Sequence, residues 1–242
     1  MLVIDAWALM QHRRKDAGAQ PFVTYVDAGT GERTELSAIS LENAAAKIAN
    51  ALRDEYGLEP GARIGIHLPL HWQRATWCAG AWTAGCALWP GLAEADLVVA
   101  DVMAAAGLGR AAGRTVAVSL HPMGLPITST LPQGVSDATV AVLSQPDAYL
   151  FGPPASWTGA FGRAGRSWTQ DEVLHLAAGR AADWGLGPGG RLLVTDSADQ
   201  QDGWLAAFAV PLVARASVVL VGGHGDLAGI AEQERATAVV TP

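Results

Sequence analysis

The sequence predicts an α/β protein built from two similar doubly wound halves with mainly parallel sheets. Short apolar runs alternate with longer helical patterns along the chain, and this alternation favours parallel strands joined by right-handed crossovers. The segments GLEPGARIGI (57–66) and GLGPGGRLLV (185–194) also match at a constant offset. This internal repeat predicts a first half over about 1–145 and a second half over about 146–242.

The first half is expected to begin with an amphipathic helix and a hairpin. The helix covers 2–15, and the turn AGTGE joins two strand-like runs, 22–27 and 33–36. Ser40 is expected to cap the next helix, which ends at Gly57. The remaining expected elements are strands over 63–68, 87–90, 97–100 and 115–119, a helix over 73–84 and a connecting loop over 121–136.

The second half is expected to repeat this order. A strand is predicted over 149–151, before a glycine-rich segment. Thr169 and Glu172 have the spacing of a capping box, which predicts a helix from Thr169 to about Gly185. The remaining expected elements are strands over 191–195, 217–221 and 236–241 and helices over 204–213 and 228–235.

The composition indicates a protein with a sizeable core and no affinity for nucleic acids. Half of the 242 residues are hydrophobic, 16% are charged, and the net charge is −7. Cys78 and Cys86 lie in an apolar stretch and are expected to be buried thiols. The N-terminus does not read as a signal peptide, and Pro211 and Arg215 interrupt the longest apolar run. We therefore expect a soluble cytoplasmic protein with no membrane partner.

The glycine-rich segment FGPPASWTGAFGRAGRSWT (151–169) occupies the position of a phosphate-binding loop. It lies between an apolar run and a predicted helix. Glycine turns let backbone N–H groups approach an anion, and the following helix presents its positive end. The segment nevertheless contains no lysine, since Lys15 and Lys47 are the only two in the chain.

Two long stretches resemble the N-terminal part of the adenylate-forming superfamily. The first is PFVTYVDAGTGERTELS (21–37), followed after a helix by GLEPGARIGIHLPLHWQRATWCAGAWTAGCALWPG (57–91). The second is YLFGPPASWTG (149–159) with WTQDEVLHLAAGRAADWGLGPGGRLLV (168–194). The superfamily contains acyl-CoA synthetases, nonribosomal peptide adenylation domains and luciferases. The resemblance implies that 1–242 is a single truncated N-terminal domain of this kind, with its fold.

The resemblance also implies which residues could bind a nucleotide. Enzymes of this superfamily convert a carboxylate and ATP into an acyl-adenylate and pyrophosphate, often before transfer to a thiol. Ser156, Thr158, Gly159 and Arg163 stand at the phosphate-loop position. Trp157 replaces a small residue, no Pro-Lys pair follows, and an arginine fork does not substitute for a mobile lysine. These residues are therefore expected to form a degenerate phosphate loop.

Other features also argue against adenylation. Asp196, Asp199 and Asp202 would repel both ATP and a carboxylate substrate. The family's adenine and ribose motifs, magnesium carboxylate and C-terminal lid with its catalytic lysine have no counterpart before Pro242. Transition-state charge on the phosphates would therefore lack its usual stabilising groups.

We therefore expect a stand-alone relative that lacks adenylation activity and acts as a binding or interaction module. No catalytic residue, metal or cofactor is expected, and ATP or AMP remains the alternative ligand. The expected partner is a second copy of the chain or a full-length synthetase. One alternative is half of a split acyl-AMP or acyl-CoA synthetase, an acid–AMP or acid–CoA ligase that needs a partner chain. Another is a sensor of a nucleotide or acyl ligand, with a pocket near Trp157 and Arg163.

Several further residues are weighed as site candidates and given structural roles. His67 and His71 could form a metal pair, but their L-P-L spacer prevents helical pairing and favours a scaffold loop. Asp96, Asp101 and Asp147 lie near strand ends, where α/β proteins bind ligands. Solvated turn carboxylates are the commoner case at such positions.

Overall fold

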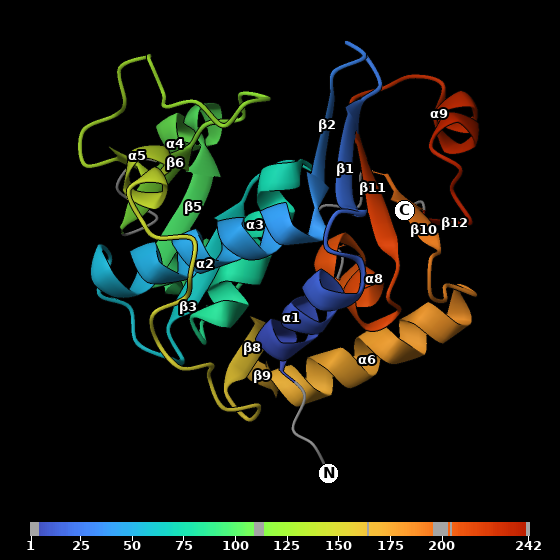
Figure 1. Cartoon of the computed structure of the whole chain (residues 1–242). Coiled ribbons are helices and arrows are strands. Elements are labelled where there is room, and N and C mark those ends of the chain that lie inside the picture. Colours follow the sequence, from blue (N-terminus) through green and yellow to red (C-terminus); the bar gives the residue numbers. More distant parts are fainter. Residues whose placement is uncertain (1–4, 109–113, 164, 196–202, 204, 241–242) are drawn as a thin grey trace.

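Two mixed sheets with helices between and around them make up the fold (Figure 1). The computed structural model describes residues 5–108, 114–163, 165–195, 203 and 205–240. Among these residues, the five-stranded sheet has the order β12-β10-β11-β1-β2 and the seven-stranded sheet the order β7-β6-β5-β3-β4-β8-β9. Neighbouring strands are parallel except in the pairs β1–β2 and β8–β9. The predicted α/β class with mainly parallel sheets is confirmed.

The elements follow the predicted alternation along most of the chain. The strands are β1 (Pro21–Asp27), β2 (Arg33–Ser37), β3 (Arg63–His67), β4 (Ala87–Leu88), β5 (Leu97–Asp101), β6 (Thr115–Val118), β7 (Ser136–Asp137), β8 (Gly159–Arg163), β9 (Arg166–Thr169), β10 (Arg191–Val194), β11 (Ser217–Gly222) and β12 (Ala238–Val240). The helices are α1 (Ala6–Ala17), α2 (Ala38–Asp54), α3 (Trp72–Thr83), α4 (Val102–Leu108), α5 (Ala138–Leu143), α6 (Gln170–Asp183), α8 (Val210–Val213) and α9 (Leu227–Gln233). A 3-10 turn, η1 (Leu92–Glu94), and a π-helical turn, η3 (Leu205–Ala209), complete the described elements.

Each sheet contains a hairpin that comes from the other part of the chain. The β1–β2 hairpin joins the sheet of β10, β11 and β12, where Val23 pairs with Val218. The β8–β9 hairpin joins the sheet of β3 to β7, where Phe161 pairs with Leu88. The predicted halves are therefore interleaved through strand pairing as well as through side-chain contacts.

The two matching sequence segments also adopt matching turns. Gly57 and Gly185 both have φ +62°. Gly61 and Gly189 also have positive φ, and their N–H groups donate to the carbonyls of residues 85 and 215 at 2.7 and 3.0 Å. Glycine takes this left-handed conformation without a Cβ penalty, which accounts for its recurrence in the two segments.

Ser37 caps α2, so the prediction that Ser40 caps this helix is wrong. The Ser37 side chain accepts a hydrogen bond from the Ser40 N–H at 3.1 Å, and the helix begins at Ala38. Both serines are good N-cap residues. The end of strand β2 places the earlier serine in the extended conformation that a cap requires.

The strand predicted over 149–151 is absent, because a buried side chain takes the place of a strand neighbour. Asn50 in α2 is fully buried, and its Nδ2 donates to the Ala148 carbonyl at 2.9 Å. Its Oδ1 accepts from the Leu150 N–H at 3.1 Å. The apolar residues of this run pack against other aromatic side chains instead, since the ring centroids of Tyr149 and Trp7 are 5.8 Å apart.

Helices α2 and α3 lie between the two sheets (Figure 1) and form the centre of the core. All of α3 is buried. A Cβ on Gly80 would lie 2.4 Å from Ile48 Cγ2, so glycine is what lets α3 approach α2 closely. Cys78 and Cys86 are buried and free, as predicted, and burial raises the pKa of each thiol to about 12.

No helix in the described part of the chain is long and apolar enough to cross a membrane.

Candidate functional site

The glycine-rich segment forms a short loop followed by a tight hairpin. Residues 152–158 connect to β8, and β8 pairs antiparallel with β9 up to Arg163 and Arg166. Gly165, in the turn of the hairpin, has φ +78°. Half of the segment expected to be a phosphate loop is therefore a pair of strands at the edge of the seven-stranded sheet.

Ser156 and Thr158 lie against the N-terminus of α6, where a bound phosphate would be expected. Their backbone carbonyls, however, accept hydrogen bonds from the first helical N–H groups. Asp171 donates to the Ser156 carbonyl at 3.2 Å, and Gln170 donates to the Thr158 carbonyl at 3.0 Å. The loop thus supplies acceptors to the donors that an anion would use.

The predicted capping box closes the same helix end. The Thr169 side chain accepts from the Glu172 N–H at 3.2 Å, and the Thr169 N–H donates to the Glu172 carboxylate at 2.8 Å. This bond from Thr169 also holds the pKa of Glu172 below its usual value. A carboxylate therefore already occupies the positive end of the helix, where it complements the helix dipole.

The four predicted site residues do not converge on one point. Gly159 begins β8 opposite Thr169, and Arg163 ends the same strand, roughly 13 Å away at the rise of an extended chain. Arg163 is exposed and pairs with Arg166 in the β8–β9 ladder. The Trp157 side chain is 75% exposed.

Gly162 is explained by packing against an aromatic side chain. A Cβ at this position would lie 1.7 Å from Cζ3 of Trp89. The Trp89 Nε1–H donates to Glu94 at 2.9 Å, and the Arg63 guanidinium lies 4.9 Å from the ring centroid. The lack of a side chain at Gly162 therefore leaves room for the Trp89 indole ring. This packing explains the glycine without a bound anion.

A groove of about 840 Å³ runs along the exposed side of α6, next to the hairpin. Arg166, Trp168, Asp171 and His175 are among its lining residues. The Arg166 guanidinium lies 4.6 Å from the Trp168 ring centroid, and His175 Nδ1 lies 2.8 Å from the Asp171 carbonyl oxygen. These polar groups already have protein partners.

The remaining sequence candidates have structural roles. Asp96 Oδ2 accepts from the Arg63 N–H at 2.8 Å, and Asp101 Oδ1 accepts from the N–H of Met103 at 2.8 Å. Asp147 pairs with Lys47 at 2.8 Å.

His71 caps α3 through Nδ1, which accepts from the Gln73 N–H at 3.2 Å, and burial lowers the pKa of His71 to about 4. No cluster of metal-ligating side chains occurs among the described residues. The acidic residues Asp196, Asp199 and Asp202 lie outside the described residues.

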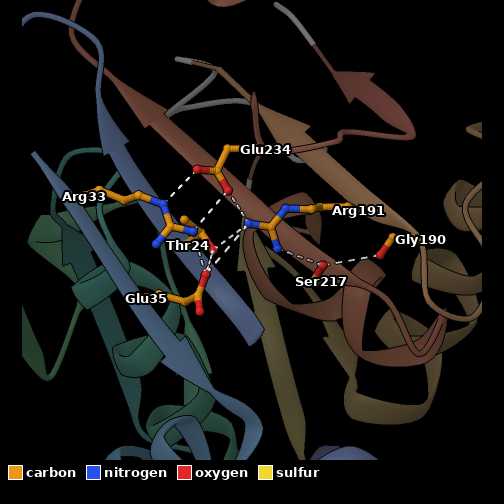
Figure 2. Close-up of polar contacts among 7 residues, drawn as sticks. All are labelled: Thr24, Arg33, Glu35, Gly190, Arg191, Ser217 and Glu234. Atoms are coloured by element: carbon orange, nitrogen blue, oxygen red, sulfur yellow. Dashed lines mark hydrogen bonds and ion pairs between the residues drawn. The ribbon is translucent and has the colours of Figure 1, made fainter. Parts of the chain in front are cut away.

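Sequence reasoning missed a polar cluster on the outer face of the five-stranded sheet, and Figure 2 shows its side chains converging. Glu234, at the end of α9, accepts from Arg33 Nε at 2.8 Å and also pairs with Arg191. Arg33 in addition bonds Glu35 at 2.7 Å, and Arg191 donates to Thr24 at 2.9 Å. The cluster therefore links β2, β1 and β10 to α9.

The charges of this cluster are paired with one another, which indicates a role in stability. The hydrogen bond from Arg33 holds the pKa of Glu234 below its usual value, with Arg191 acting in the same direction. The Glu234 side chain is only 6% exposed, and two guanidiniums balance the two carboxylates. Removing one member would leave a buried charge uncompensated, which is strongly destabilising.

Comparison with known proteins gives the family. No protein-family model matches the chain. A TIGR03089 family protein from Mycobacterium tuberculosis (strain ATCC 25618 / H37Rv) is 39% identical over 207 residues, covering 83% of this chain and 82% of that protein. The chain belongs to the TIGR03089 family.

Solved structures show the fold of this TIGR03089 member. An acyl-CoA synthetase from Brucella canis matches 98% of the chain with a TM-score of 0.78 and 17% identity. An acetoacetyl-CoA synthetase from Streptomyces lividans gives 0.76 and 17%, and apo MatB from Rhodopseudomonas palustris gives 0.72 and 18%. The chain therefore has the fold of the N-terminal domain of adenylate-forming enzymes, as the sequence resemblance implied.

The TIGR03089 chain spans less than half the length of each of these solved structures. It covers 47% of the Brucella protein, 42% of the Streptomyces protein and 49% of MatB. The likeness, at this level of identity, extends to the fold. Activity has to be argued from the residues of the chain itself.

Proposed function

We propose that this TIGR03089 member does not adenylate and acts as a binding or interaction module, a pseudoenzyme on an adenylate-forming fold. One observation carries the proposal. The first N–H groups of α6 bond to the Ser156 and Thr158 carbonyls and to the Thr169 side chain, with the Glu172 carboxylate alongside. A nucleotide phosphate would have to displace these acceptors and face that carboxylate.

The distribution of cations supports the same proposal. Phosphoryl chemistry needs positive charge placed at the phosphates. Lys47 pairs with Asp147 on another part of the molecule, and Arg163 lies at the far end of β8 from Ser156. Neither is placed to assist a phosphate beside α6. Arg166 lines the groove beside α6 and lies over the Trp168 ring, and we propose no catalytic residue, metal or cofactor.

The interaction role is supported by apolar side chains that face solvent. Val140 and Leu143 on α5 are 56% and 54% exposed, and Met123 in the preceding loop is 79% exposed. Exposed apolar side chains on neighbouring elements are typical of interaction surfaces. A second copy of the chain or a full-length synthetase is the proposed partner, in a cytoplasmic setting. We also keep the two-repeat organisation as part of this proposal, because the turns at Gly61 and Gly189 match.

ATP–pyrophosphate exchange with a panel of fatty, aromatic and amino acids tests the proposal. The purified chain is expected to give no exchange above the level of a no-protein sample, beside an active full-length synthetase as positive control. Robust exchange by the chain alone would refute the proposal. Calorimetric titration with ATP and AMP separates loss of catalysis from loss of binding, and no heat of binding is expected.

A split synthetase is the second candidate function, and it is favoured by the match of 98% of this chain to less than half of a synthetase. It predicts that the chain co-purifies with a polypeptide carrying the remaining motifs. Exchange activity that appears only in that mixture would support the split enzyme and reject the non-catalytic module.

A ligand sensor is the third candidate, because Trp157 and Arg163 are both exposed. Thermal-shift measurements with ATP, AMP and an acyl-CoA test it. A Trp157→Ala variant tests the stacking site directly. If a ligand stacks on Trp157, this variant should lose the increase in melting temperature that the ligand causes in the unmodified protein.

A further inference from the structure

A pocket of about 610 Å³ lies where the first residues of β10 and β11 meet α1, the β1–β2 hairpin and the end of α9. Its volume falls within the range of about 300–1,000 Å³ that is usual for small-molecule sites. Pro21 is the only residue with an apolar side chain among the described lining residues. The pocket therefore offers no surface for an acyl chain and no aromatic ring on which a nucleobase could stack.

Part of the pocket wall is the polar cluster on the five-stranded sheet. Figure 2 shows the five residues that belong to both: Glu35, Gly190, Arg191, Ser217 and Glu234. Within the cluster, Arg33 and Arg191 both pair with Glu35 and with Glu234. Two positive charges thus balance two negative ones, so this part of the wall is close to neutral.

Two further arginines line the pocket without a carboxylate partner. Arg13 on α1 is half-buried, and its guanidinium makes no hydrogen bond or ion pair with another described residue. Burial lowers the pKa of Arg13 and nearby Asp16 raises it, but a guanidinium stays charged at neutral pH. Arg235, just after α9, is exposed, and its guanidinium also makes no such bond. The pocket therefore has two positive charges that no described carboxylate pairs with, in a chain whose net charge is −7.

These two unpaired arginines favour a doubly charged anion as the ligand. A guanidinium presents its N–H groups in a planar fork that fits the oxygens of a phosphate. A phosphate monoester carries about −1.5 to −2 charges at pH 7, close to the two unpaired positive charges. A carboxylate carries one negative charge, so the balance of charge favours the phosphate monoester.

Amide side chains indicate what the phosphate is attached to. Gln20 and Gln233 line the same pocket, are exposed, and make no side-chain hydrogen bond with another described residue. An amide can both donate to and accept from a hydroxyl group. We propose that this pocket binds a sugar phosphate, with the phosphate at Arg13 and Arg235 and the hydroxyl groups at the two glutamines. The site goes beyond the proposed function, because it shares no residue with the 151–169 segment or with α6.

Glucose 6-phosphate tests the proposal, with glucose and inorganic phosphate as its separate parts. Isothermal titration calorimetry of the purified chain should show saturable binding of glucose 6-phosphate, weaker binding of inorganic phosphate and none of glucose. Arg13→Gln and Arg235→Gln should each weaken glucose 6-phosphate binding about ten-fold, because each removes a charge-assisted hydrogen bond. Inorganic phosphate that binds as tightly as glucose 6-phosphate would reject recognition of the sugar.

Lys15→Gln is the matched control, because it removes the same charge from the same helix. Lys15 is exposed and is not among the described lining residues. Its loss should change the affinity by less than about two-fold, because solvent and salt screen exposed charges at a distance. Thermal unfolding without ligand checks that each variant is folded. Absence of saturable glucose 6-phosphate binding, or equal binding by the folded arginine variants, would overturn the proposal.

Discussion

Replacing Gly162 by alanine is expected to destabilise the protein by about 2 kcal/mol. The new Cβ would lie 1.7 Å from Trp89 Cζ3 and 2.3 Å from Cε3. The Trp89 ring cannot easily move away, because Glu94 bonds its nitrogen and Arg63 lies over its face. Overpacking of this kind costs about 1–3 kcal/mol. Alanine offsets less than about 1 kcal/mol of this cost, because it leaves the unfolded chain less conformational freedom than glycine does.

Gly159, in the same strand, provides the matched control. A Cβ there would lie 3.3 Å from Ser167 Oγ and 3.6 Å from Ala87 Cβ, which small adjustments can accommodate. Gly159→Ala is therefore expected to remain within about 0.5 kcal/mol of the unmodified protein.

Urea unfolding monitored by tryptophan fluorescence measures both variants, with the midpoint and the m-value fitted separately. In a Trp89→Leu background, Gly162→Ala should cost at least about 1.5 kcal/mol less than it does alone, because the clashing ring is gone. Equal stabilities for the two glycine variants, or an unchanged cost without Trp89, would refute the packing role of Gly162.

Three further predictions concern the helix end, the polar cluster and one backbone position. Thr169→Ala should lower the free energy of unfolding by about 1 kcal/mol in urea unfolding, because α6 loses its cap, and an unchanged midpoint would contradict the capping box. Glu234 has a lowered folded-state pKa, so the stability it contributes should be complete above about pH 5 and decline as the pH falls through the lowered pKa. Glu234→Gln should remove that decline in thermal unfolding between pH 3 and 7, and an unchanged pH profile would argue against the cluster. Arg215 has φ +54° at the position that matches Gly85 in the other turn, so Arg215→Gly should raise the free energy of unfolding in urea by up to about 1 kcal/mol, and a lower value would reject backbone strain.

Local signals in the sequence predicted the elements that depend on neighbouring residues. The AGTGE turn predicted the β1–β2 hairpin, and the spacing of Thr169 and Glu172 predicted the capping box at α6. Both motifs are complete within a few residues, so no tertiary contact was needed to recognise them.

The errors arose where distant residues decide the local structure. Asn50 bonds the backbone around Ala148, which removes the strand expected there. Gly162 was interpreted as part of a phosphate loop, but Trp89 requires a glycine at that position. The cluster on the five-stranded sheet joins Arg33 to Glu234, which are 201 residues apart. Nothing in the sequence pattern pairs such residues before the fold is known.

The exchanged hairpins have a consequence for how the chain folds during synthesis. Val23 in β1 pairs with Val218 in β11. The β1–β2 hairpin is therefore synthesised long before the strand with which it pairs. At typical translation rates that delay is roughly 10 to 40 s. During it, β1 has an unpaired edge, which is the kind of surface that leads to misassembly between nascent chains. The ribosome-bound intermediate is therefore a species in which β1 is open to wrong strand pairing.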